Sequence, residues 1–140
     1  MSTIQGKAWG QTRCVYAACN VEVHRIEVVA GGFCSEHQHT AKVNRFYVES
    51  GVLEVLVWHG DEPDVTRLTA GQMTDVQPNL WHSFKADTAV VAYEIYSSTS
   101  NASDIIRRSI GGVDVPALGP ILTSIIGVTD DGRAIDGATD

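Results

Sequence analysis

The sequence has 140 residues and a mass of 15.1 kDa, which is the size of one ordinary domain. Hydrophobic residues make up 44% and charged residues 19% of the chain, a composition typical of globular rather than disordered proteins. The formal net charge is −7, whereas binding to a polyanion begins with a cationic surface. We therefore expect no nucleic-acid partner.

Membrane, targeting and disulfide patterns are also missing from the sequence. No apolar run approaches the ~20 residues that span a bilayer, so we expect no membrane partner. The first seven residues lack the apolar core of a signal peptide, which predicts a cytoplasmic protein. The three cysteines, Cys14, Cys19 and Cys34, cannot all pair and show no C-x-x-C spacing. This pattern argues against a disulfide framework and against a cysteine zinc site.

Short β-rich segments separated by glycine, proline and aspartate run from Val21 to Tyr96. The clearest alternation places Leu53, Val55 and Val57 on one face of a strand. Helical periodicity is absent from this part of the sequence. The expected strands are residues 21–30, 33–41, 42–50, 52–58, 65–69, 74–77, 83–85 and 90–97. Short strands at this spacing predict an all-β barrel or sandwich.

The two ends of the chain differ from this strand-rich middle. The expected parts are an N-terminal extension at 1–20, a barrel at 21–98, a helical and apolar segment at 99–126 and an acidic tail at 127–140. Ser103 or Asp104 could cap a short helix that continues through Arg108. The apolar stretch 118–126 could form a helical turn or a strand docked on a neighbouring element. The tail has too few apolar residues to offset the entropy of ordering.

Three histidines form the candidate metal site. His37 and His39 are two residues apart, so on a strand their side chains point to the same face. His82 follows Pro78 in a turn and could join them from a different strand. Three neutral imidazoles can hold a divalent ion and leave positions open for water or substrate. The alternative is that each histidine is an ordinary polar side chain without a ligand.

The spacing around the histidine pair resembles a known motif. Gly31, five residues, His37-x-His39, four residues, Asn44, six residues and Gly51 is similar to the first motif of the cupin family. In that motif Asn44 occupies the place where a glutamate usually completes the metal shell. The resemblance implies a single cupin barrel, that is, a double-stranded β-helix or jelly roll, with short terminal extensions.

A second stretch strengthens the resemblance. Gly71, six residues, Pro78 and His82 resembles the second cupin motif, although its spacing is altered and Leu80 replaces a common glycine. The two motifs together imply that His37, His39 and His82 are metal ligands. Cupins include isomerases, epimerases, dioxygenases, lyases, decarboxylases and proteins that only bind, so the motifs do not identify a reaction.

Two shorter matches narrow the resemblance. Residues 7–10 (Lys-Ala-Trp-Gly) are similar to the lead-in of small mannose-6-phosphate isomerase-like cupins. Residues 93–96 (Tyr-Glu-Ile-Tyr) followed by 104–108 (Asp-Ile-Ile-Arg-Arg) are similar to the ending of that group.

Asn44 is the main departure from the cupin pattern. If it binds the metal through its neutral amide oxygen, three histidines and one asparagine leave the ion at its full +2 charge. A more positive ion is a stronger Lewis acid toward a carbonyl or enediolate oxygen. The alternative is that Asn44 does not bind the metal and that three histidines remain alone.

Strand alternation also predicts the surroundings of the metal. Phe33 and Ser35 lie an even number of residues before the histidine pair, so they are expected to face inward with it. Phe46 and Val48 are expected to face inward with Asn44 for the same reason. The expected pocket is apolar with few polar groups, as small-molecule sites usually are.

Two further residues are candidate catalytic groups. His24 shares the predicted inward face with Ile26 and Val28 and could transfer protons; the alternative is a surface histidine or one whose partners lie in the core. Glu94 is a candidate general base if it faces inward. The alternation in its strand does not decide the orientation, and a charged strand residue usually marks the solvated face.

The expected cofactor of the chain is one divalent transition metal ion, Mn, Fe, Zn, Ni or Co. Three functions fit these observations. The first function is isomerisation or epimerisation of a small, sugar-like carbonyl substrate with the assistance of a divalent metal. The second is oxygen activation at a three-histidine Fe(II) site. The third is a cupin that binds a metabolite without catalysis.

The resemblance also implies a homodimer, because small cupin barrels commonly pair through their sheets and terminal segments. The apolar stretch 118–126 supports this expectation, since a small barrel has little interior left to cover it.

Overall fold

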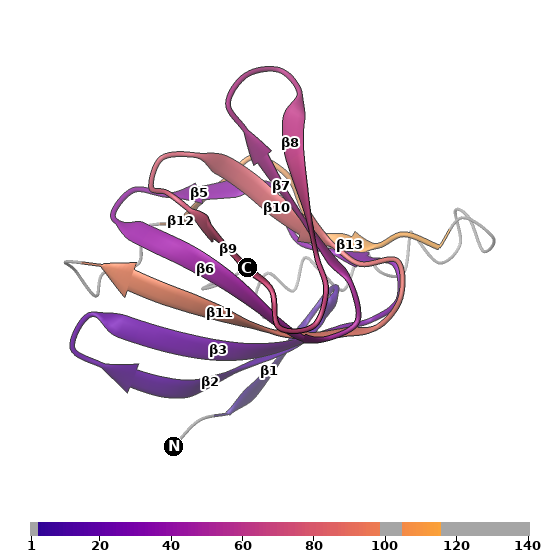
Figure 1. Ribbon diagram of the computed structural model, residues 1–140, viewed down its shortest axis with the longest axis horizontal. Helices are drawn as coiled ribbons and strands as arrows, with labels where there is room; N and C mark the ends of the chain where they lie inside the picture. Colours follow the sequence, from indigo (N-terminus) through magenta and orange to yellow (C-terminus); the bar gives the residue numbers. More distant parts are fainter. Residues whose placement is uncertain (1–2, 99–104, 116–140) are drawn as a thin grey trace.

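The computed structural model describes residues 3–98 and 105–115, and in that part of the chain every regular element is a β-strand (Figure 1). The strands are β1 (Ile4–Lys7), β2 (Gly10–Ala18), β3 (Val21–Val28), β4 (Gly32–Phe33), β5 (His37–His39), β6 (Lys42–Ser50), β7 (Leu53–Trp58), β8 (Pro63–Leu68), β9 (Met73–Val76), β10 (Trp81–Lys85), β11 (Val90–Ser98), β12 (Ile105–Arg107) and β13 (Gly112–Val113). Within these residues we find no helix of the length and apolarity that crossing a membrane requires.

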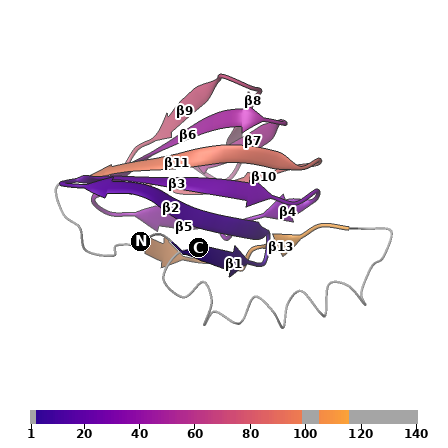
Figure 2. The same cartoon turned by 90° about the horizontal axis from the view of Figure 1, so that it is seen from below.

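The strands form two antiparallel sheets. The first has six strands in the order β1-β2-β3-β11-β6-β9, and Figure 2 shows most of them stacked in this order. In the second sheet, β10 pairs with β4, β5 and β7, while β8 extends the sheet beyond β7. The outer edge of β4 and β5 is covered by β13 and β12. This arrangement confirms the all-β barrel expected from the sequence.

The core lies between the inner faces of the two sheets. Side chains alternate along β6, where Asn44, Phe46 and Val48 are completely buried and Arg45 is exposed. The Phe46 and Phe84 rings have their centroids 6.0 Å apart and bring the two sheets into contact. Apolar side chains therefore fill one end of the barrel, and the polar residues at the other end form the candidate site.

The N-terminal 20 residues, expected to be an extension, contribute two strands to the first sheet. β2 pairs with β3 from Gly10 opposite Val28 to Ala18 opposite Val21. The sequence does not reveal this pairing, because β2 is mostly exposed on both faces and lacks a clear apolar alternation.

The short helix expected up to Arg108 is wrong where the structure describes it. Residues Ile105–Arg107 form β12, whose Ile105 lies opposite His39 and whose Arg107 lies opposite His37. Pairing with an open strand edge satisfies backbone groups that a single helical turn would leave without partners. The possible caps Ser103 and Asp104 lie outside the described residues, as do 116–140 with the apolar stretch and the tail.

Phe33 was expected to face the interior, and it does not. The chain between β4 and β5 is irregular, so the alternation changes phase before His37. Cys34 is consequently the core residue, while Phe33 lines the outer face of the second sheet. Ser35 is buried as predicted.

Gly31 makes the sharp turn that leads into the histidine strand. Its φ angle is +81°, a conformation that L side chains rarely adopt. A Cβ atom at Gly31 would lie 2.3 Å from the Asp114 carbonyl oxygen, so this close approach of two backbones requires glycine.

Candidate metal centre

The second sheet brings the three predicted histidines together. His37 and His39 lie on β5, and His82 lies directly opposite His37 on the adjacent strand β10. Their ring centroids are 4.4 to 5.5 Å apart, and one ring nitrogen from each lies within 4.8 Å of the other two. All three side chains are buried. These residues form a group that can hold a metal ion.

Backbone carbonyl groups orient two of the imidazoles. His37 Nδ1 donates to the Ser35 carbonyl oxygen at 2.9 Å, and His82 Nδ1 donates to the Leu80 carbonyl oxygen at 2.9 Å. A neutral imidazole that donates through Nδ1 keeps the lone pair on Nε2. Both histidines are therefore held in the tautomer that can bind a metal through Nε2.

Burial keeps His37 and His82 neutral. Desolvation, aided by the nearby His39, lowers the pKa of His82 from its usual 6.5 to about 4, although the hydrogen bond to the Leu80 carbonyl group acts in the opposite direction. Burial, together with repulsion from His82 and His39, also holds the pKa of His37 well below its usual value. A neutral imidazole is the form that binds a metal, so protons compete weakly with the ion at pH 7.

Asn44 lies completely buried inside the barrel, on β6 of the first sheet. Its Nδ2 donates to Glu94 Oε2 at 3.3 Å. Its Oδ1 is buried and has no hydrogen-bond partner among the described residues. An amide with a paired nitrogen and an unpaired oxygen suits a side chain that uses the oxygen as a ligand.

Glu94 faces the interior, which the sequence left undecided. It is 7% exposed, and its Oε2 accepts hydrogen bonds from Asn44 Nδ2 and from the Tyr96 hydroxyl at 3.1 Å. Among the described residues, only the histidines meet the mutual spacing of the metal-binding group, so Glu94 lies outside it. The buried amide of Asn44 therefore has the buried carboxylate of Glu94 as its hydrogen-bond partner.

His24 lies beside Glu94 on the inner face of the first sheet, since the two residues are paired across β3 and β11. Its Nε2 is 3.0 Å from Glu22 Oε1, and its side chain is largely buried. The ring of Tyr96 contacts both His24 and His39, with centroid distances of 5.5 and 5.2 Å. Tyr96 thus connects the two candidate catalytic residues with the metal-binding group.

Tyr96 is the site residue that sequence reasoning missed. Its position two residues after Glu94 places both on one face, but the sequence did not show which face is inward. What shows its orientation is the strand register, in which Tyr96 lies opposite the buried Asn44 across β11 and β6. A register between distant strands cannot be read from local alternation alone.

Comparisons with known proteins identify the fold. Neither the known protein families nor the curated proteins contain a match to this sequence. The structure is similar to CapF, the capsular polysaccharide assembling protein of Staphylococcus aureus, with a TM-score of 0.68 and 17% identity. It is also similar to Pac13 of Streptomyces, a nucleoside dehydratase, with a TM-score of 0.65 and 14% identity. A third similar structure is oxalate decarboxylase of Bacillus subtilis, with a TM-score of 0.68 and 13% identity.

The extent of these matches decides what they mean. The alignment with CapF covers 79% of this chain and 35% of CapF. The alignment with Pac13 covers 78% of this chain and 86% of Pac13. The alignment with oxalate decarboxylase covers 99% of this chain and 38% of that protein. The similarity to a protein with a double-stranded β-helix domain agrees with the two sheets described above. The protein has the cupin fold. Since this cupin spans about a third of CapF and of oxalate decarboxylase, their whole-protein activities are not carried over. The narrower resemblance to mannose-6-phosphate isomerase-like cupins stays a prediction.

The interior of the cupin fits a metal ion by its own chemistry. Besides Asn44 Oδ1, His82 Nε2 is a buried atom without a hydrogen-bond partner among the described residues. An unpaired buried nitrogen costs stability unless something binds it. A divalent transition metal would pair both atoms.

The low pKa of His82 predicts a pH-dependent stability of the metal-free cupin. Below pH 6.5 the unfolded chain binds a proton at His82 that the folded chain binds only near pH 4, so stability falls as the pH falls through this window. We expect a loss of about 3 kcal/mol in the free energy of unfolding between pH 7 and pH 4 from this residue. Urea unfolding of the metal-free protein against pH measures it.

The matched comparison is between two histidine substitutions. His82→Gln should flatten the pH dependence of the free energy of unfolding, whereas His59→Gln, on an exposed loop, should leave it unchanged. Equal pH profiles for His82→Gln and the parent would contradict the assignment.

Proposed function

We propose that this cupin is an enzyme that binds one divalent transition metal through His37, His39 and His82 and isomerises or epimerises a sugar-like carbonyl substrate. The observation that carries the proposal is the position of a buried carboxylate, Glu94, which accepts hydrogen bonds from Asn44 and from Tyr96, whose ring contacts His39. Neutral ligands and a nearby buried carboxylate suit proton transfer at a carbon next to a carbonyl group.

The chain's own residues would divide the work as follows. The metal, when bound, would supply Lewis-acid polarisation of the substrate's carbonyl oxygen. Glu94 would accept the proton from the substrate carbon, with its Oε2 held in place by Asn44 and Tyr96. His24, beside Glu94, is the second proton-transfer group, and Glu22 orients its ring.

The second candidate function is oxygen activation at a three-histidine Fe(II) site. It is favoured by one observation, which is that the metal-binding group contains three histidines and no carboxylate among the described residues. Metal analysis of protein purified without added salts distinguishes the two functions. Iron supports the dioxygenase, and manganese, zinc, nickel or cobalt supports the isomerase.

The test of the isomerase is proton exchange. The metal-loaded protein is incubated in D₂O with a panel of aldoses and ketoses, with and without phosphate, together with uridine because Pac13 is a nucleoside dehydratase. NMR then follows deuterium entering the carbon next to the carbonyl group. Exchange or isomer formation with a panel member supports the proposal. No turnover with any sugar, but saturable binding of one, would indicate a cupin that only binds metabolites.

Substitutions of Asn44 test its role at the metal. Asn44→Ala is expected to lower metal occupancy if the amide oxygen is a ligand. Asn44→Glu is expected to raise occupancy and lower turnover, because a charged ligand makes the ion a poorer electrophile. The structure adds that a carboxylate at position 44 would repel Glu94, so the metal-free Asn44→Glu protein should also be less stable.

Metal content, turnover and melting temperature of both variants measure these effects. If both variants match the parent in metal content and turnover, Asn44 is a packing residue and three histidines alone hold the ion.

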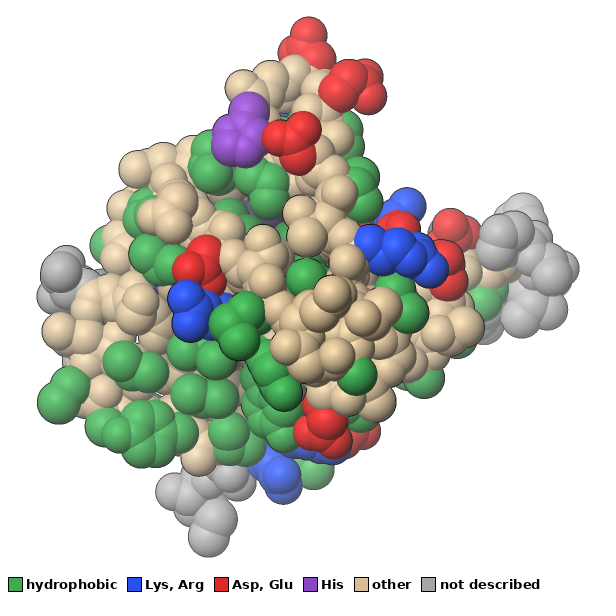
Figure 3. Space-filling view, viewed as in Figure 1, with side chains coloured by type: hydrophobic (Ala, Val, Ile, Leu, Met, Phe, Trp, Pro, Cys, Tyr) green, Lys and Arg blue, Asp and Glu red, His purple; other side chains and the backbone are tan. Residues whose placement is uncertain are grey.

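We also propose a homodimer. Figure 3 shows apolar side chains gathered over β3 and β11 on the outside of the first sheet. A cavity of about 300 Å³ on this face is lined by Val21, Val43 and Ile95 and flanked by the Arg45–Asp75 ion pair. An exposed apolar patch of this kind often marks an interface.

Light scattering at low protein concentration should therefore give a mass near twice 15.1 kDa. A mass near 15 kDa would count against the dimer. The cytoplasmic location stays a prediction from the sequence.

A further inference from the structure

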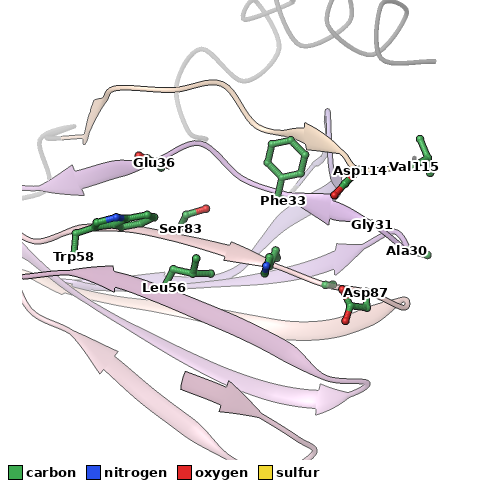
Figure 4. A pocket seen from close by; sticks show the side chains of 12 residues that line it. Ala30, Gly31, Phe33, Glu36, Leu56, Trp58, Ser83, Asp87, Asp114 and Val115 are labelled. Carbon is green, nitrogen blue, oxygen red and sulfur yellow. The ribbon is translucent and has the colours of Figure 1, made fainter. Parts of the chain in front are cut away.

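A large groove lies on the outer face of the second sheet, separate from the histidines. Ser83 and Lys85 line it, and they alternate along β10 with the buried His82 and Phe84, so the groove and the metal-binding group lie on opposite faces. Its volume is about 680 Å³. Figure 4 labels most of the residues that line the groove, which come from β4, β7, β10, the loops beside them and the end of the described chain at Val115.

The groove presents apolar surface toward solvent. Phe33, Leu56 and Trp58 point into it from β4 and β7 (Figure 4). Two charged residues at its rim already have partners, because Glu36 pairs with Arg108 at 3.0 Å and Lys85 with Glu54 at 3.6 Å. The carboxylates of Asp87 and Asp114 lie at the same rim and would repel an acidic occupant. The groove therefore suits an uncharged, apolar segment.

The chain itself reaches this groove at the end of the described residues. β13 pairs with β4, and the Asp114 amide donates to the Gly31 carbonyl oxygen beside the groove. Val115 is the last described residue, and it lines the groove. The next residues of the chain therefore start at the groove rim.

The sequence that follows has the matching character. Residues 116–129 carry no charge, and they include Leu118, Ile121, Leu122, Ile125 and Ile126. Nine extended residues, 118–126, span roughly 30 Å at ~3.3 Å each. Three neighbouring strands such as β4, β10 and β7 are only about 10 Å across from first to last at the usual strand spacing. The segment is long enough to cross the groove, and the acidic residues begin only at Asp130.

We propose that residues 118–126 pack into this groove of their own chain and cover Phe33, Leu56 and Trp58. This placement removes the apolar side chains of both surfaces from water. It also leaves the outer face of the first sheet as the surface for a dimer. The proposal does not depend on a bound metal or on the reaction.

Photo-crosslinking in the full-length protein tests the placement. A benzophenone amino acid replaces Ser124, which leaves the apolar residues intact, and irradiation followed by mass spectrometry identifies the crosslinked peptides. We expect crosslinks to peptides containing Phe33, Leu56 or Trp58. The control is the same probe at Ala134 in the acidic tail, which should not crosslink to the groove. Absence of groove crosslinks from position 124 would overturn the proposal.

Mixing chains of natural isotope composition with ¹⁵N-labelled chains identifies the chain that donates the segment. Crosslinks only within chains of one label support docking on the same chain. Crosslinks between light and heavy chains would overturn it and show that a second copy supplies the segment.

A substitution in the groove gives an independent measurement. Leu56→Asp should raise the rate of chymotrypsin cleavage within 118–126 at least tenfold, because the segment loses its apolar contact. Met73→Asp, exposed on β9 of the first sheet and away from the groove, should leave the cleavage rate unchanged. Melting curves of both variants show whether the barrel stays folded. If the parent is cleaved as fast as folded Leu56→Asp, the segment is not docked there.

Discussion

His39→Ala is expected to abolish stable metal binding. The substitution leaves two imidazoles for the ion and opens a cavity next to His37, His82 and Tyr96, which all contact the His39 ring. Loss of residues that merely orient metal ligands already lowers metal affinity by roughly 10- to 100-fold, so loss of a ligand should cost more. Metal content after dialysis and a competition titration with a chelator measure the effect. The proposed catalysis should disappear with the ion.

The matched control is His59→Ala, because His59 is exposed on the loop before β8 and lies against the exposed Asp64. It should retain the metal content of the parent. If folded His39→Ala keeps its metal and its affinity, the histidine group is not the metal site, and the proposed enzyme loses its basis.

Glu94→Gln is expected to separate catalysis from metal binding. Glutamine has nearly the same shape and can still accept hydrogen bonds from Asn44 and Tyr96, but it cannot accept a proton from the substrate. The rate of deuterium exchange should fall by roughly 10²- to 10⁴-fold, the usual contribution of a general base. Metal content should stay at the parental level, because Glu94 lies outside the metal-binding group.

Glu49→Gln provides the control for this substitution. Glu49 accepts a hydrogen bond from the Tyr93 hydroxyl at 2.8 Å, as Glu94 does from Tyr96, but it lies on the exposed surface. It should exchange deuterium at the parental rate. An unchanged rate in Glu94→Gln would remove Glu94 from the mechanism and leave His24 as the remaining candidate base.

The sequence was sufficient for the parts of the site that depend on regular alternation. His37 and His39 are held on one face because a strand has a period of two, and the same period correctly buried Asn44, Phe46 and Val48. The barrel itself was predictable because short apolar segments ended repeatedly at glycine, proline or aspartate.

Two features could not be predicted because they depend on irregular or distant contacts. Phe33 faces outward because the chain is irregular between β4 and β5, so side chains no longer alternate there between the two faces of the sheet. The residue types in this stretch do not predict the irregularity. Glu94 can face inward because its carboxylate has hydrogen-bond partners there: Asn44 on the neighbouring strand β6 and Tyr96 on its own strand β11. A carboxylate with such partners can be buried, which the general preference of charged residues for solvent does not anticipate.

The carbonyl groups that orient His37 and His82 belong to the backbone of Ser35 and Leu80. Every amino acid carries such a carbonyl group, so substitutions at positions 35 and 80 keep this hydrogen bond as long as the main chain keeps its course. A substitution of Leu80 can therefore leave His82 held in place, whereas a substitution of Ser35 removes only the additional contact of its hydroxyl, 3.3 Å from His37 Nδ1. The orientation of the two imidazoles thus depends mainly on the course of the main chain and only slightly on which side chains surround them.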